Sequence, residues 1–91
     1  MGRKKVNYNP KGIESLPNDK PVLYRIETAS GNPNYVGVAK RGRVNERLTE
    51  HLDEIPGAKV NIEQFSSIKD AREKEQRVIK RNSPKYNKLG T

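Results

Sequence analysis

The sequence contains no cysteine and no tryptophan, and only one phenylalanine and one methionine among its 91 residues. Without cysteine there is neither a disulfide nor a thiolate metal site. Hydrophobic residues make up 31% of the chain, so the expected core is thin. No apolar run approaches the roughly 20 residues that span a bilayer. We therefore expect one small cytoplasmic domain with no membrane contact.

Positive charge is in excess. Lysine and arginine outnumber aspartate and glutamate by 19 to 11, which gives a formal net charge of +8. Such an excess favours a polyanionic partner, and DNA or RNA fits better than a membrane surface. Solubility alone is the plainer explanation. The charge distinguishes neither DNA from RNA nor binding from cleavage.

The first 15 residues include lysine or arginine at positions 3, 4, 5 and 11 and show no hydrophobic periodicity. We expect them to form a flexible basic arm, which either contacts phosphate groups or has no role. Apolar residues begin to matter at Leu16, so residues 16–91 are expected to form a single domain.

Two segments with strand character flank a turn in the first half of this domain. Residues 22–28 alternate between two faces, and residues 35–39 form a second, largely apolar strand. Between them, residues 30–34 read Ser-Gly-Asn-Pro-Asn, which is typical of a turn. A connection this short predicts an antiparallel hairpin.

The second half of the domain predicts a helix, a strand and a second helix. Apolar residues recur with helical spacing between Val44 and Ile55, and a Pro-Gly pair ends that helix. Residues 59–65 alternate as a third strand would. A capping-box pattern at residues 67–70 opens a helix that continues to about Arg81. The order strand–strand–helix–strand–helix predicts an α+β domain with one sheet covered by helices.

Three ionisable residues are expected on the apolar faces of these helices. Glu75 falls within the stripe of the second helix, where a carboxylate is costly unless it pairs with a cation or binds a metal. An ion pair is the commoner case, and a Mg²⁺ ligand is the functional one. Arg47 and His51 share a face of the first helix. A lone histidine there is more often a packed residue, but a buried arginine needs an anion, and a phosphate group would serve.

Two tyrosines complete the candidate site. Tyr24 and Tyr35 lie on paired strands and can approach one another, although taken alone they favour a role in the core. A phenol needs nearby cations to act as a base, and Arg47 and Lys40 could supply them. With the histidine and the carboxylate of the helices, these groups suffice for phosphodiester hydrolysis. A phenol or imidazole takes a proton from water, the cations stabilise developing charge, and the carboxylate holds Mg²⁺.

The two tyrosines lie in short triplets that resemble the signature of the GIY-YIG nuclease superfamily. The triplets are Val22-Leu23-Tyr24 and Tyr35-Val36-Gly37. The resemblance covers about residues 16–88. Within the superfamily, the sequence most resembles the N-terminal nuclease domain of the bacterial excision-repair endonuclease and small stand-alone members. It also includes Leu16-Pro17, Ala39-Lys40, Arg47 with His51, Glu75 and Pro84-Lys85-Tyr86-Asn87.

The resemblance implies a three-stranded antiparallel sheet flanked by helices, in a nuclease that depends on Mg²⁺ or Mn²⁺. It implies that Glu75 is the metal ligand and that Arg47 is the transition-state cation. Either Tyr24 or Tyr35 would be the general base, assisted by His51. The expected function is an endonuclease that acts on DNA in repair or in the processing of branched structures, with RNA as an alternative substrate.

The resemblance also implies roles for a glycine, for three basic residues and for an asparagine. Gly37 would let its strand pack closely under the site. Ninety-one residues leave no room for the separate DNA-binding module of many relatives. Specificity would then come from the basic loops, from self-association or from a protein partner. The implied substrate contacts are Lys40, Arg41, Arg43 and Asn87, the last of which would brace the site.

Two other functions remain open from the sequence alone. A non-catalytic basic domain could keep the fold and only bind nucleic acid. A structural basic protein, such as a ribosome-associated one, could carry its inward charges by accident. Retention of both tyrosines together with the arginine, histidine and glutamate favours catalysis, because binding alone needs only surface lysine and arginine.

Overall fold

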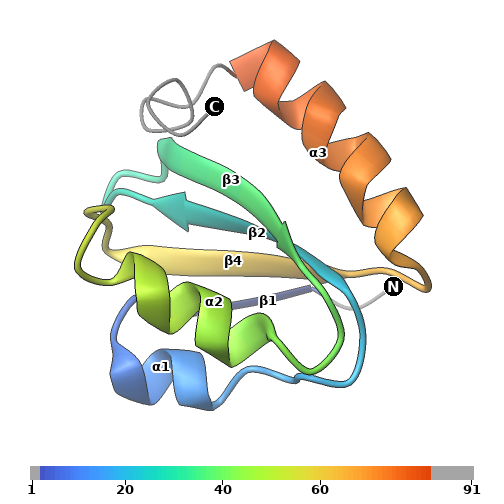
Figure 1. Ribbon diagram of the computed structural model, residues 1–91. Coiled ribbons are helices and arrows are strands. Elements are labelled where there is room, and N and C mark those ends of the chain that lie inside the picture. The colour runs from blue at the N-terminus through green and yellow to red at the C-terminus, as the bar shows by residue number, and fades with distance from the viewer. Residues whose placement is uncertain (1–2, 83–91) are drawn as a thin grey trace.

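The computed structural model describes residues 3–82, which form a four-stranded antiparallel sheet and three helices (Figure 1). The strands lie in the order β1-β4-β2-β3, so β1 and β3 are the two edges. The α+β class is confirmed, and the expected three-stranded sheet is wrong by one strand. The elements are β1 (Arg3–Asn7), α1 (Pro10–Glu14), β2 (Val22–Glu27), β3 (Pro33–Ala39), α2 (Val44–His51), β4 (Lys59–Gln64) and α3 (Ile68–Asn82).

The hairpin of β2 and β3 places the two tyrosines on one face of the sheet. Tyr24 pairs with Gly37, and Ile26 pairs with Tyr35. Residues two apart on a strand share a face, so Tyr35 lies on the same side as the Tyr24–Gly37 pair. In the connecting turn, Gly31 has a φ of +93°, which glycine adopts without strain. The predicted antiparallel hairpin is therefore confirmed.

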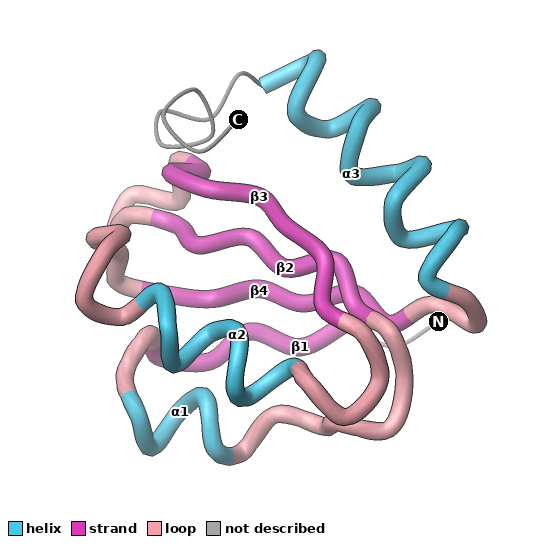
Figure 2. Tube along the Cα trace, viewed as in Figure 1, coloured by secondary structure: helices cyan, strands magenta, loops and turns pink. Residues whose placement is uncertain are grey.

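Each face of the sheet carries its own hydrophobic core. On one face, β2 and β4 pack against α1 and α2; on the other face, α3 packs against β2 and β3. Figure 2 shows α1 and α2 beside one another and α3 along β3. The first core buries Ile13, Leu16, Val22, Tyr24, Ile26, Ala39, Val44, Leu48, Ile55, Val60 and Ile62, and the second buries Leu23, Val36, Phe65, Ala71 and Val78.

The helical spacing read from the sequence is confirmed in both predicted helices. α2 buries Val44 and Leu48 and ends at His51, earlier than expected. A turn then returns Ile55 to the same core, with its backbone N–H bonded to the carbonyl of His51 at 2.8 Å. α3 is capped by Ser67, whose hydroxyl accepts a hydrogen bond from the backbone N–H of Asp70 at 3.2 Å.

The expectation of a flexible arm over residues 1–15 is wrong for the part that the structure describes. β1 pairs along its length with β4, with Val6 opposite Val60. α1 follows, with Asn9 as its N-cap and Pro10 in its first turn, a helix signal that the sequence did contain. The sequence did not predict β1, because this edge strand is held by backbone hydrogen bonds to β4, which do not depend on the type of side chain. Its only apolar residue is Val6, so it shows no hydrophobic alternation.

Candidate active site

Tyr24 is fully buried on β2, and its side chain crosses the neighbouring strand at Gly37. A Cβ atom added at Gly37 would lie 2.7 Å from the Tyr24 hydroxyl oxygen, so the glycine leaves the space that the phenol fills. Tyr35, two residues earlier on β3, stacks against Tyr24 with ring centroids 6.1 Å apart and an angle of 28°. The hairpin therefore holds two phenols together at an edge of the sheet.

His51, at the end of α2, joins the two phenols. Its Nε2 lies 2.8 Å from the Tyr24 hydroxyl in a buried hydrogen bond, and its ring centroid lies 4.9 Å from that of Tyr35. The Tyr8 hydroxyl donates to the carbonyl oxygens of His51 and Ile55, at 2.7 and 2.9 Å. The segment after β1 thus fixes the end of α2 and, with it, the imidazole.

The protonation of His51 follows from its surroundings. Burial and the nearby positive charge of Arg47 lower its pKa, so the ring is neutral at pH 7. Its Nδ1 is buried and has no hydrogen-bond partner within residues 3–82. Either neutral tautomer leaves this nitrogen without a partner, which costs about 1–3 kcal/mol. The tautomer decides whether Nε2 donates to the Tyr24 oxygen or accepts from its hydroxyl group.

Arg47, one turn before His51 on α2, supplies positive charge beside the phenols. Burial raises the pKa of Tyr24 and of Tyr35 above the ordinary value, and the charge of Arg47 opposes this. Burial has the larger effect on the pKa of both phenols, so the charge of Arg47 reduces the rise in pKa without reversing it. An ion pair of Arg47 Nη1 with Glu50 Oε1, at 3.5 Å, involves two half-exposed side chains.

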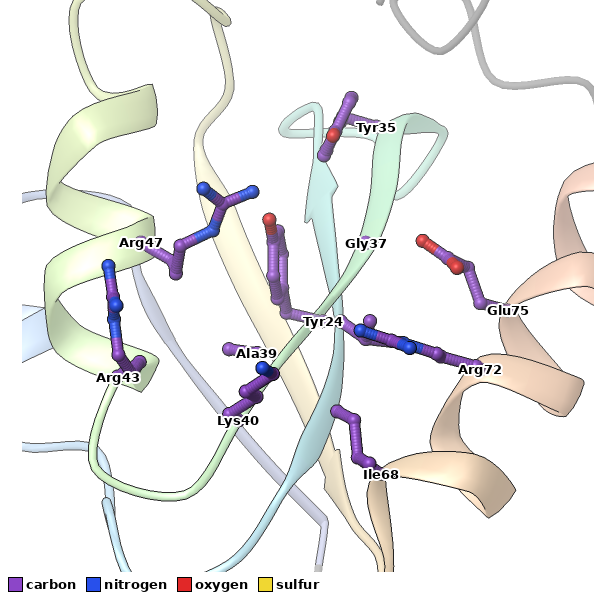
Figure 3. A pocket seen from close by; sticks show the side chains of 11 residues that line it. Tyr24, Tyr35, Gly37, Ala39, Lys40, Arg43, Arg47, Ile68, Arg72 and Glu75 are labelled. Atoms are coloured by element: carbon purple, nitrogen blue, oxygen red, sulfur yellow. The ribbon is translucent and has the colours of Figure 1, made fainter. Parts of the chain in front are cut away.

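Glu75 reaches the phenols from the other side of β3. α3 covers the opposite face of the sheet, but β3 is an edge strand, so a helix along it can place side chains beside those of α2. Glu75 lines one cleft of about 330 Å³ together with Tyr24, Tyr35 and Arg47 (Figure 3). Burial raises its pKa. Within residues 3–82 no ion pair joins Glu75 to a cation, so the commoner explanation of this carboxylate does not apply there.

The remaining predicted residues divide between the cleft and its surroundings. Lys40 and Arg43 line the cleft, where Figure 3 shows them on the side of α2 and the end of β3. Arg41 lines a separate hollow near Pro21 instead. Asn87 lies outside the described residues. The basic loop is therefore split, and Arg41 points to a different surface.

Arg72 lines the cleft and was not predicted. It lies three residues before Glu75 on α3, so both project from the same side of the helix. The positive charge of Arg72 lowers the pKa of Glu75, against the larger effect of burial. The three-residue spacing was the sequence signal that Arg72 shares a helix face with Glu75. It indicates a site residue only once Glu75 is known to line the cleft.

The cleft offers a metal ion one protein ligand. Among the described residues that line it, Glu75 is the sole acidic side chain. No group of three His, Cys, Asp or Glu side chains within residues 3–82 could hold a metal ion. Mg²⁺ commonly takes one or two carboxylates and completes its shell with water and phosphate oxygens. Glu75, a half-buried carboxylate with no ion pair in the described part of the chain, fits that pattern.

Comparison with protein families and with curated proteins gives no match. No protein-family model matches the chain, and no curated protein matches it. None of the helices within residues 3–82 has the length and the apolar character that crossing a membrane requires. Function must therefore be inferred from the site.

Proposed function

We propose that this protein is a metal-dependent endonuclease that hydrolyses phosphodiester bonds of DNA. The observation that carries the proposal is one cleft lined by two phenols, a guanidinium and a carboxylate that forms no ion pair within residues 3–82, from β2, β3, α2 and α3. A protein that only binds nucleic acid gains nothing from a carboxylate in a cationic cleft. Glu75 would repel a bound phosphate unless a metal ion lay between them.

The phenols supply the base. Hydrolysis joins a water oxygen to phosphorus and breaks the bond to one ester oxygen, which leaves with a proton from solvent. The charge of Arg47 opposes the rise in pKa that burial causes in both phenols, and one of them, Tyr24 or Tyr35, would take a proton from the attacking water. Tyr35 is the more exposed of the two, and the phenol that is not the base would position the water. Comparison of Tyr24→Phe with Tyr35→Phe decides which of them is the base.

Arg47 and Glu75 meet the phosphate from opposite sides of β3. Arg47 would stabilise the negative charge that the phosphate oxygens gain in the transition state. Glu75 would hold Mg²⁺ or Mn²⁺ with water and phosphate oxygens as the other ligands. When bound, such an ion neutralises charge on the phosphate.

The resemblance to the GIY-YIG nuclease superfamily supports the same function. From β2 onward the elements follow the order strand–strand–helix–strand–helix. Tyr24, Tyr35, Arg47 and Glu75, to which the resemblance assigns chemistry, line the cleft, and His51 contacts Tyr24 from outside it. β1 and α1 are additions to that pattern. The proposal includes action in DNA repair or on branched DNA, in the cytoplasm.

A nicking assay tests the proposal. Supercoiled, branched and single-stranded DNA are incubated with the protein and Mg²⁺ or Mn²⁺, with a chelator in parallel. We expect cleavage of at least one substrate, and a loss of about 100-fold or more in Glu75→Gln and in Arg47→Gln. Arg77→Gln is the matched control, because Arg77 is an exposed arginine of α3 outside the cleft, and it should cut like the wild type.

Cleavage that survives in Glu75→Gln, or no cleavage with either metal, refutes the nuclease. DNA binding that persists in the variant and falls steeply with salt would then support the alternative, a non-catalytic basic domain that keeps the fold.

A further inference from the structure

The cationic side chains of the cleft exceed what one phosphate requires. Its described lining holds four cations, Lys40, Arg43, Arg47 and Arg72, and one carboxylate, Glu75. A single phosphodiester carries one negative charge. The proposed chemistry already assigns Arg47 to that group, so the other cations are available to a different ligand.

Two of these cations are not neutralised by acidic neighbours. Arg43 pairs with Glu46 at 3.0 Å, and Arg47 pairs with Glu50 at 3.5 Å. In the described part of the chain, neither Lys40 nor Arg72 takes part in an ion pair. Both are exposed and line the cleft, so they present uncompensated positive charge to a ligand there.

Arg72 has a simpler explanation, namely that it neutralises Glu75 one turn along α3. The two side chains form no ion pair within 4.0 Å, however, and burial still raises the pKa of Glu75 despite the charge of Arg72. In Figure 3, Arg72 extends from α3 toward β3, and the carboxylate of Glu75 lies nearer the Gly37 end of the strand. Neutralising the carboxylate therefore does not account for the position of the guanidinium.

The cleft runs along β3 and has two chemically different ends. Tyr35 and Gly37 mark the end with the phenols and Glu75, and Lys40 follows the strand at the other end, with Arg72 facing it (Figure 3). At about 3.4 Å per residue, the backbone of Lys40 lies roughly 10 Å beyond Gly37. That separation suits two phosphates of one strand better than two contacts to the same phosphate.

We infer that Arg72 and Lys40 form a second phosphate subsite, which holds the phosphate next to the one that is cut. The inference rests on the proposed nuclease function and adds to it the substrate class. The preferred substrate is a DNA strand with consecutive phosphates, threaded along β3 between α2 and α3. Arg72 is then a substrate-binding residue, and charge-assisted hydrogen bonds to phosphate give its guanidinium that capacity.

Binding of two small nucleotides, without divalent metal, tests the subsite separately from cleavage. The probes are thymidine 5′-monophosphate and thymidine 3′,5′-bisphosphate, titrated into the wild type and followed by NMR or calorimetry. We expect the second phosphate to tighten binding about 10-fold, as one charge-assisted hydrogen bond would. In Arg72→Gln this gain should fall below about 3-fold. Arg77→Gln removes the same charge from the same helix and should keep the gain.

The subsite is refuted if Arg72→Gln keeps the full gain, if Arg77→Gln loses as much, or if neither nucleotide binds at millimolar concentration. An Arg72-dependent gain without any nicking would leave a two-phosphate binding site and remove only the nuclease. If nicking occurs, Arg72→Gln should raise KM about 10-fold with little change in kcat, and a change confined to kcat would contradict a binding role.

Discussion

Gly37 is the position where a single methyl group should do most damage to the site. Its missing Cβ would lie 2.7 Å from the Tyr24 hydroxyl oxygen and 2.8 Å from the ring carbon that carries it, and ordinary contacts begin at 3.4 Å. Gly37→Ala must therefore displace the phenol by about 0.6–0.7 Å. Tyr24 is fully buried, so its ring cannot move aside without disturbing the core.

The magnitude follows from two opposing effects. Overpacking a close-packed core costs about 1–3 kcal/mol. Replacing glycine by alanine in a strand recovers roughly 0.5–1 kcal/mol of conformational entropy. The mid-points of these ranges leave a net loss of about 1.3 kcal/mol. A domain of this size melts roughly 4–8 °C lower for each kcal/mol, so we expect a melting temperature about 5–10 °C below that of the wild type by calorimetry.

The same displacement should reduce cleavage more than it reduces folding. The hydrogen bond between Tyr24 and His51 is 2.8 Å long and cannot keep its geometry if the hydroxyl moves by this distance. A misplacement of about 1 Å in a reacting group can cost 100-fold. We therefore expect kcat to fall by about 10- to 100-fold in the nicking assay, at a temperature where the variant is folded.

Gly31→Ala is the matched control. Gly31 has a φ of +93° and no atom within 4 Å of an added Cβ, so alanine there is strained only in its backbone. It should cost about 1–2 kcal/mol and leave the activity of the folded protein unchanged. The steric explanation is refuted if Gly37→Ala melts and cuts like the wild type. It is also refuted if Gly31→Ala loses as much activity.

The remaining predictions concern stability. The pKa of Glu75 is raised above 4.5 in the folded state, so the folded protein binds more protons than the unfolded chain just above that pH, and wild-type stability falls as pH rises through this window. Glu75→Gln cannot ionise, so it should melt at a higher temperature than the wild type at pH 7 and at the same temperature below about pH 4. If the variant and the wild type differ by the same amount in melting temperature at both pH values, burial of the carboxylate is not the cause. Tyr8→Phe removes the donor to the carbonyl oxygens of His51 and Ile55 and should cost about 1 kcal/mol in chemical denaturation. A Tyr8→Phe protein as stable as the wild type would show that this contact does not hold the end of α2.

Local patterns were sufficient where neighbouring residues decide the structure. The turn chemistry of residues 30–34 predicted the hairpin, and the spacing from Val44 to Leu48 predicted α2. The edge strand β1 escaped prediction because its partner β4 lies more than 50 residues away and contributes backbone hydrogen bonds, which leave no pattern in side chains.

For the candidate site, the sequence by itself determined the group nearest the hairpin. Tyr24 and Tyr35 are brought together by one turn, and α2 begins five residues after β3 ends, so Arg47 and His51 can be assigned to the same face from spacing alone. The sequence also placed Glu75 on an apolar stripe, where an isolated carboxylate needs an explanation.

Only the tertiary structure decided which distant side chains share the cleft. Glu75 and Arg72 belong to a helix on the opposite face of the sheet and meet the phenols because β3 is an edge strand. Strand order depends on the pairing of β4 with β2 and not with β3, which is a long-range choice that no local pattern records.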